Sequence, residues 1–161
     1  MKKQKGFSLI ELLIVVAIIL IIAAIAIPNL MRSKMAANQS SAVGSLRTIN
    51  TAEVTYSTTY PAIGFAPNLV TLGAAVGVNC GNVAATSAAA CLIDPVLANG
   101  TKSGYVFTVT GGGGTPTVTY TSLALPQVAN QTGQNAYCSD QSGVLYYDTS
   151  GTACSAASNA L

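Results

Sequence analysis

One long hydrophobic segment dominates the first part of the chain. Residues 12–27 are sixteen consecutive apolar residues, and the run extends back to Phe7 with only Ser8 and Glu11 interrupting it. About 20 apolar residues in a helix span the hydrocarbon core of a bilayer. The pattern therefore predicts an apolar helix, long enough to cross a membrane, that reaches Pro28.

After Pro28 the apolar positions become periodic. They recur every three, four or seven residues, which places them on one side of a helix with polar and basic residues on the other side. This stripe comprises Met31, Met35, Ala42, Leu46, Ile49, Glu53 and Tyr56, with Val43 and Val54 beside it. We expect the helix to continue to about Ser57, so that it would be roughly 75 Å long at 1.5 Å per residue.

The remaining residues predict short helical turns followed by strands. Tyr60 and Pro61 mark the end of the long helix, because proline and the residue before it disfavour its continuation. We expect turns of helix at 69–72 and 93–97. Alternating apolar and β-branched residues then predict strands at 104–110, 115–125, 135–139 and 143–148. An antiparallel sheet of three or four strands, packed on the helix stripe, gives an α+β fold.

Composition and charge exclude several functional classes. Half of the residues are hydrophobic, 7% are charged, and the net charge is +2, which excludes a disordered chain and a basic nucleic-acid-binding surface. The absence of histidine removes the commonest general base and metal ligand. The glycines at 111–114 lie between strands and lack the Lys-Ser/Thr of a phosphate-binding loop. We expect no catalytic residue, cofactor or metal, and no enzymatic activity.

Three interpretations of the hydrophobic segment remain open at this point. Three basic residues and no acidic one precede it, namely Lys2, Lys3 and Lys5, so the positive-inside rule places the N-terminus in the cytoplasm. The segment is a signal anchor, a secretory signal peptide cleaved near Ala24-Ile25-Ala26, or a helix that uses Glu11. A carboxylate inside a membrane helix is costly, and the first two interpretations give it no role.

The residues around Glu11 resemble a known family. Residues 5–16, KGFSLIELLIVV, are similar to the class III signal of type IV pilins and pseudopilins, in which a basic leader ends in Gly and is followed by Phe and an apolar helix with Glu at its fifth position. The resemblance implies that a prepilin peptidase cleaves between Gly6 and Phe7 and methylates the new Phe7 amine. It further implies that Glu11 faces the N-terminal amine of a neighbouring subunit.

Pro28 stands where pilins commonly carry a proline, and the resemblance therefore implies a role for it in assembly. Many pilins also carry a glycine eight residues earlier, where this chain has Leu20. Proline permits a kink or a locally melted turn, and Leu20 favours a stiffer first half of the helix.

Four cysteines allow three pairings. An exported domain meets an oxidising compartment, so disulfides are expected. We favour the sequential pairing, which closes two short loops, Cys80 with Cys91 and Cys138 with Cys154. No pair forms a C-x-x-C motif, which disfavours redox catalysis and zinc. In the resembling family a disulfide often brackets a C-terminal loop, as Cys138 and Cys154 would.

The sequence thus predicts four segments and an assembly function. They are a leader at 1–6, a membrane or filament-core helix at 7–28, an amphipathic half of that helix at 29–58, and a globular region with the sheet at 59–161. By resemblance the chain is the major pilin of a type IV pilus, a homopolymer for adhesion, motility or DNA uptake. Its partners would be the prepilin peptidase, the pilus assembly machinery and, before assembly, the bacterial inner membrane.

A major pseudopilin of a type II secretion system is the alternative function. A calcium ion shared by Asp140 and Asp148 would favour that alternative, although a turn and a strand end explain two such carboxylates more simply. No small-molecule substrate is expected, and the sequence leaves binding of nucleic acid open.

Overall fold

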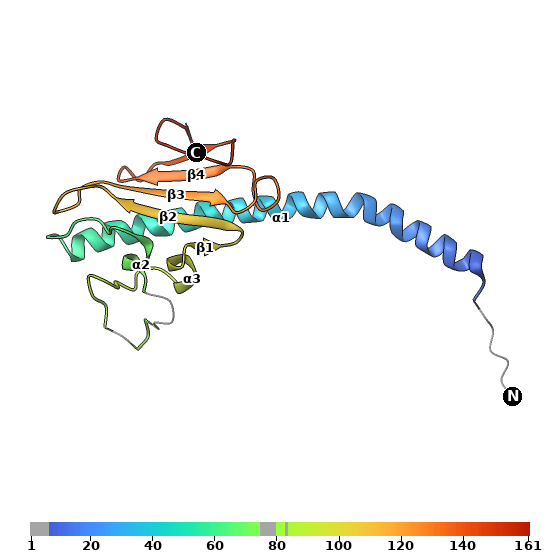
Figure 1. Ribbon diagram of the computed structural model, residues 1–161, viewed down its shortest axis with the longest axis horizontal. Coiled ribbons are helices and arrows are strands. Elements are labelled where there is room, and N and C mark those ends of the chain that lie inside the picture. Colours follow the sequence, from blue (N-terminus) through green and yellow to red (C-terminus); the bar gives the residue numbers. More distant parts are fainter. Residues whose placement is uncertain (1–6, 75–79, 83) are drawn as a thin grey trace. The chain divides into compact units, whose positions relative to one another are not determined.

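The computed structural model describes residues 7–74, 80–82 and 84–161. Its helices are α1 (Leu9–Thr59), α2 (Leu69–Leu72) and α3 (Pro95–Ala98), so the long helix and both short turns of helix are confirmed. The chain divides into two compact units, one reaching Lys34 and one comprising Met35–Leu161. The second unit, which we call the head, contains the rest of α1 and all of the sheet (Figure 1).

Six antiparallel strands form one sheet in which neighbours in sequence are neighbours in space. They are β1 (Thr101–Lys102), β2 (Tyr105–Gly111), β3 (Tyr120–Pro126), β4 (Ala136–Asp140), β5 (Leu145–Asp148) and β6 (Asn159–Ala160). The α+β class is therefore confirmed. The expected three or four strands become six because β1 and β6 are two residues long, too short to show an alternating pattern.

The second strand begins later than expected. We predicted residues 115–125, but β3 starts at Tyr120. Pro116 has no backbone N–H to donate to a ladder. Its neighbour Thr117 pairs with the loop after α1 instead, where Phe65 N–H donates to Thr117 O at 2.9 Å. Tertiary contact therefore decided where this strand begins.

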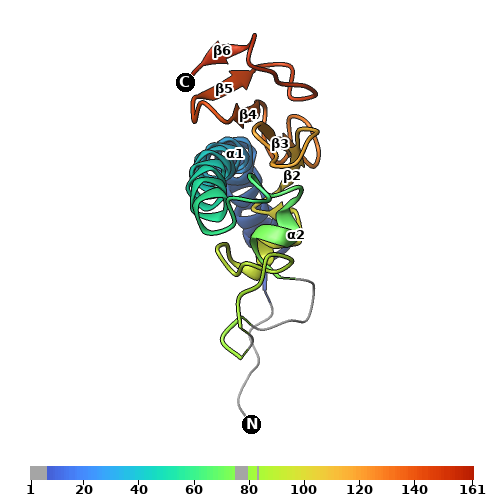
Figure 2. The same cartoon turned by 90° about the vertical axis from the view of Figure 1, so that its left-hand side faces the viewer.

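The core lies between one face of the sheet and the head portion of α1 (Figure 2). The helix contributes Ala42, Leu46, Ile49, Ala52 and Tyr56, and the sheet contributes Tyr105, Phe107, Val109, Ala124, Tyr137 and Leu145. These helix positions confirm much of the predicted stripe. Val54 is a correction, because it is 56% exposed. Val54 lies about 100° around the helix from Glu53, beyond the reach of the sheet.

Polar side chains connect α1 to particular strands. The Asn50 amide donates to Ser139 Oγ at 2.8 Å and accepts from the Tyr120 hydroxyl at 3.1 Å. Nearer the start of the head, the Asn38 amide donates to Thr132 O at 2.8 Å. Hydrogen bonds are directional, so these contacts fix the helix position along the sheet more narrowly than apolar contacts do.

Gly133 offers a test of packing in the head. A Cβ atom there would collide with the ring and hydroxyl of Tyr105, which is fully buried and donates to Asn135 O at 2.9 Å. We expect Gly133→Ala to destabilise the head by about 1–3 kcal/mol, as overpacking does, in urea unfolding of the detergent-solubilised protein. Gly113→Ala is the control, since its Cβ meets no atom within 4 Å. Equal midpoints for both variants would contradict this packing.

Candidate functional site

The first unit presents an apolar helix without a covering. The large apolar side chains between Leu9 and Leu30 are 45–80% exposed, and none of the most apolar stretch is buried. Among the residues that the structure describes, α1 is the one helix long and apolar enough to cross a membrane. A continuous apolar surface of this kind marks contact with lipid or protein. We therefore regard this part of α1 as the candidate functional site.

Glu11 has a local role that the sequence reasoning missed. Ser8 directly precedes α1, and its backbone N–H donates to Glu11 Oε2 at 2.9 Å. A carboxylate at the third helical residue that reaches back to the N-cap backbone forms half of a capping box. The spacing S-x-x-E was visible in the sequence. Within one subunit Glu11 therefore satisfies a backbone donor at the start of its own helix.

The other three positions predicted for processing and assembly are Gly6, Phe7 and Pro28. Phe7 precedes α1 and is 84% exposed, whereas Gly6 lies outside the described residues. Pro28 is inside α1, which is continuous across it. Because proline donates no backbone hydrogen bond, the Ala24 carbonyl loses its helical partner. The helix therefore tolerates Pro28 without ending there.

The head contains two disulfides with the sequential pairing that we favoured. Cys80 is joined to Cys91, and Cys138 in β4 is joined to Cys154, with Cα atoms 5.6 and 5.7 Å apart. Each closes a short loop, of 11 and 16 residues in sequence separation. A crosslink over a loop of this size stabilises a fold by about 3 kcal/mol. The second disulfide holds the segment between β5 and β6 against the sheet.

Glu53 is a buried carboxyl whose importance sequence reasoning also missed. Its side chain is fully buried; Oε2 accepts the Ala66 N–H at 2.8 Å, and Oε1 has no hydrogen-bond partner. Burial raises the pKa of Glu53 to about 7, although the Ala66 N–H favours the charged form. The signal in the sequence was an acid on an apolar helical stripe. Glu53 ties the loop after α1 to the helix.

The two carboxylates considered for calcium are not brought together. In the β4–β5 hairpin Asp148 pairs with Ala136, so Asp140 and Asp148 lie at opposite ends of the strands. Each accepts a nearby backbone N–H, from Ser142 at 2.8 Å and from Ser150 at 2.7 Å. The described residues contain no group of three or more His, Cys, Asp or Glu placed to hold a metal. Both carboxylates cap turns, as the simpler explanation predicted.

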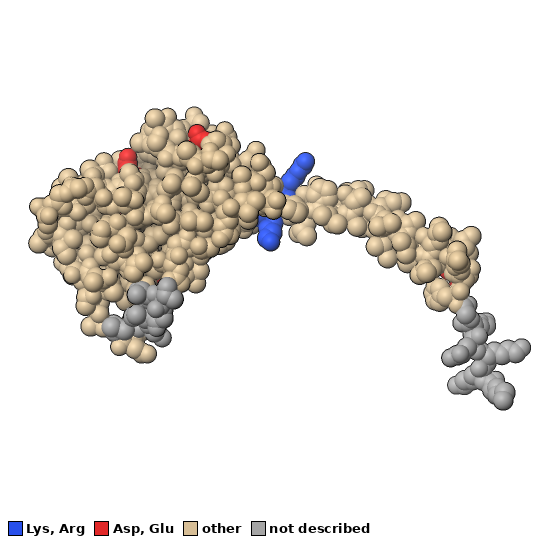
Figure 3. Space-filling model, in the orientation of Figure 1, with Lys and Arg blue, Asp and Glu red and all other residues tan. Residues whose placement is uncertain are grey.

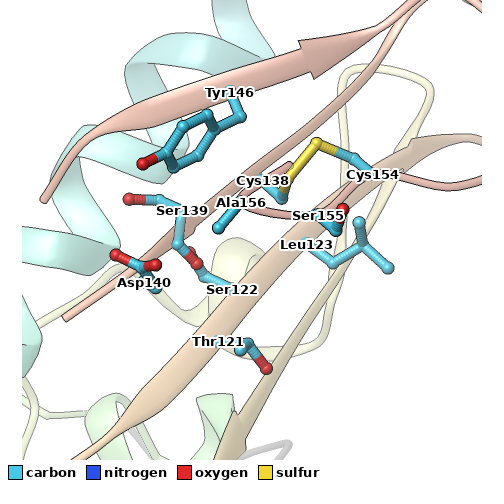
Figure 4. Close-up of a pocket in the computed structure, with 10 residues that line it drawn as sticks. All are labelled: Thr121, Ser122, Leu123, Cys138, Ser139, Asp140, Tyr146, Cys154, Ser155 and Ala156. Atoms are coloured by element: carbon cyan, nitrogen blue, oxygen red, sulfur yellow. A yellow bond between two sulfur atoms is a disulfide. The ribbon is translucent and has the colours of Figure 1, made fainter. Parts of the chain in front are cut away.

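A small cavity lies beside the second disulfide (Figure 4). It has a volume of about 220 Å³, and Tyr146, Leu123 and Ala156 are among its lining residues. The hydroxyls of Ser122 and Ser139 in its wall are already hydrogen-bonded, to Ser139 O and Val144 O. The lining contains no lysine, arginine or histidine. Its walls therefore offer apolar contact rather than a constellation for catalysis.

Comparison with known proteins supports the N-terminal assignment. Residues 1–27 match the family model described as the prokaryotic N-terminal methylation motif. The chain is 46% identical over 72 residues to the type IV major pilin protein PilA of Myxococcus xanthus, which covers 40% of this chain and 33% of that protein. It is 58% identical over 40 residues to the type IV wide pilus major component PilA4 of Thermus thermophilus, covering 25% and 30%. No solved structure matches the chain.

The chain spans about one third of the length of these two relatives. The fold adds an independent observation, namely a long N-terminal helix packed on an antiparallel sheet. In its methylation motif, its likeness to two major pilins and this architecture, the chain resembles the type IV pilins.

Proposed function

We propose that this chain is the major structural subunit of a type IV pilus. The observation that carries the proposal is the exposed apolar part of α1, which follows a methylation motif and carries a single acid near its start. Two relatives to which the chain is similar are named as major pilus components. The chain acts by assembling with copies of itself rather than by catalysis.

Assembly transfers the apolar helix from one apolar environment to another. Before assembly, the segment at 7–28 holds the subunit in the inner membrane with its N-terminus in the cytoplasm, as the three N-terminal lysines favour. The pilus assembly machinery then moves this helix into a bundle at the filament core. Hydrocarbon and packed apolar side chains are similar environments, so the transfer costs little. Contacts between different surfaces of successive copies do not close, and a filament results.

Processing precedes assembly in this proposal. A prepilin peptidase cleaves between Gly6 and Phe7, removing the basic leader and leaving Phe7 with a methylated amine. The new amine and Glu11 of a neighbouring copy then neutralise each other in the apolar core. Pro28 adapts the helix to its packing among neighbours. The filament lies on the cell surface, with the head forming its exterior.

The proposal is tested by isolating filaments from the native cells. Shearing is expected to release long fibres whose main subunit begins at methylated Phe7, as determined by intact mass and N-terminal sequencing. A subunit with this N-terminus that occurs in the membrane without long fibres would indicate a pseudopilin instead. A subunit beginning near Ile27 would indicate a conventional signal peptide and would overturn the filament proposal.

A further inference from the structure

The chain has few charged side chains, namely seven Lys and Arg and five Asp and Glu. The described residues carry nine charged side chains: Glu11, Arg32, Lys34, Arg47, Glu53, Asp94, Lys102, Asp140 and Asp148. Four of them lie in an ion pair, at the start of α1 or in the core. Lys102 Nζ lies 2.9 Å from Asp94 Oδ2, Glu11 accepts the Ser8 N–H, and Glu53 is buried.

Glu11 and Glu53 aside, five charged side chains of the described residues form no ion pair. The ion pair between Lys102 and Asp94 is the one formed within the described part of the chain. The cations Arg32, Lys34 and Arg47 all belong to α1, whereas the anions Asp140 and Asp148 both belong to the β4–β5 hairpin. On the face that Figure 3 shows, blue side chains lie where α1 enters the head, and two red patches lie on the head. Positive and negative charges are therefore separated onto two different surfaces.

The cations on α1 face opposite directions. Arg32 and Lys34 are two residues apart, which is about 200° around a helix. Both side chains are exposed, and they directly follow the apolar run. One turn of α1 therefore offers a cation on each of two sides, so that two different neighbours can be contacted at once.

The two anions, Asp140 and Asp148, lie apart on the β4–β5 hairpin. Asp140 ends β4 and Asp148 ends β5, at opposite ends of the hairpin, so four residues of strand separate them, or about 14 Å. Hydrogen bonds from the Ser150 hydroxyl and backbone N–H hold the pKa of Asp148 below its usual range. Asp148 is therefore anionic at physiological pH.

We propose that Arg32 and Lys34 of one copy pair with Asp140 and Asp148 of neighbouring copies in the filament. The proposal rests on the proposed function, since it concerns contacts within the polymer. The two surfaces differ and belong to the same chain, so each copy offers both halves of the contact, and the arrangement repeats without closing. Like charges brought together at an interface oppose association, which makes charge a determinant of register.

Anionic lipid headgroups are the other class of partner that would suit Arg32 and Lys34. Pairing with lipid would leave both Asp140 and Asp148 without a cation, whereas pairing between copies satisfies all four side chains. The described chain is otherwise so poor in charge that few other protein groups are available to either surface. We therefore commit to a second copy of this chain as the partner.

Carbodiimide crosslinking of sheared wild-type filaments tests the contact directly. This reagent joins a lysine amine to a carboxylate that already touches it. We expect intermolecular crosslinks from Lys34 to Asp140 or Asp148, seen as a ladder of oligomers and identified by mass spectrometry. The pair Lys102 and Asp94, 2.9 Å apart within one chain, is the internal positive control. Recovery of the control crosslink without any from Lys34 to these acids would overturn the inference.

Charge exchange tests whether the contact matters for assembly. We expect the variants Arg32→Asp with Lys34→Asp, and Asp140→Lys with Asp148→Lys, each to lower the yield of sheared filaments at least about tenfold. Combining all four changes in one chain is expected to restore the yield, because attraction is regained with exchanged signs. Arg47→Asp, on the same helix but outside the proposed contact, is the control and should assemble normally.

The outcomes separate this inference from the proposed function. A wild-type chain that forms no filaments contradicts the proposed function itself. Wild-type filaments together with unchanged yields for both reversed variants contradict the charge contact alone. The chain with Arg32→Asp and Lys34→Asp could instead disappear from the membrane fraction and not be rescued by the two changes to lysine. That result would assign Arg32 and Lys34 to lipid and would also overturn the inference.

Discussion

Replacing Glu11 with alanine is expected to leave the chain in the membrane and to abolish filaments. In the proposed filament, the carboxylate neutralises the Phe7 amine of a neighbour inside an apolar core. Removal of one member of a buried pair leaves the other charge uncompensated, at a cost of about 3–5 kcal/mol. That loss recurs at every subunit, so assembly should fail while membrane insertion, which depends on the apolar run, persists. Membrane fractionation and electron microscopy of sheared fibres measure the two outcomes.

The contact between Glu11 and Ser8 within one subunit makes a second variant necessary. Loss of the capping hydrogen bond alone weakens the start of a helix by about 1 kcal/mol. Glu11→Gln retains an oxygen that accepts the Ser8 N–H but removes the charge. We expect this variant also to form no filaments. Normal filaments with glutamine and none with alanine would assign Glu11 to the helix cap and would contradict the charge pairing.

The stability of the head is expected to fall as the pH rises from about 4.5 to 7. Burial raises the pKa of Glu53 from 4.5 to about 7 in the folded chain. Below pH 4.5 the carboxyl is protonated in both states. Between these values the unfolded chain ionises while the folded one stays protonated, and above pH 7 the folded state carries the full penalty. The free energy of unfolding is therefore expected to be about 3 kcal/mol lower above pH 7 than below pH 4.5. Urea unfolding of the solubilised protein across this range measures it.

Glu53→Gln is the variant that tests this origin of the pH dependence. The amide oxygen still accepts the Ala66 N–H but no longer ionises, so we expect the slope between pH 4.5 and 7 to disappear. Tyr56 and Tyr120 are the titratable groups that interact with Glu53, and burial raises the pKa of both above the range in question. Asp148→Asn, at an exposed turn, should leave the slope unchanged. A glutamine variant with the wild-type slope would contradict the assignment to Glu53.

Some features of the fold could be predicted from the sequence because they depend on the pattern of neighbouring residues. Continuous apolar residues, then a helical stripe, predicted α1 to within two residues at each end. Alternation predicted β2, β4 and β5, and the spacing of the cysteines favoured the pairing that the structure contains. The patterns of α1 and of these strands are visible in the sequence because a helix or a strand buries one face only if apolar residues recur at its fixed period.

Other features needed contacts between distant parts of the chain. The start of β3 depends on Thr117 pairing with the loop after α1 rather than with a strand. The edge strands β1 and β6 are held by their neighbours, not by their own two residues. Asp140 and Asp148 are eight residues apart in sequence, and only the hairpin register places them at opposite ends.

The amino-acid sequence by itself determined the long helix, its unbroken apolar surface and the motif around Glu11, because each of these is a run of neighbouring residues. The tertiary structure decided which side chains of that helix are covered and at what electrostatic cost. Glu53 and Val54 are adjacent in sequence, yet the first is fully buried and the second is 56% exposed. The reason is physical: burial depends on where the sheet and the loop at Ala66 pack against the helix, and those surfaces come from residues far away along the chain.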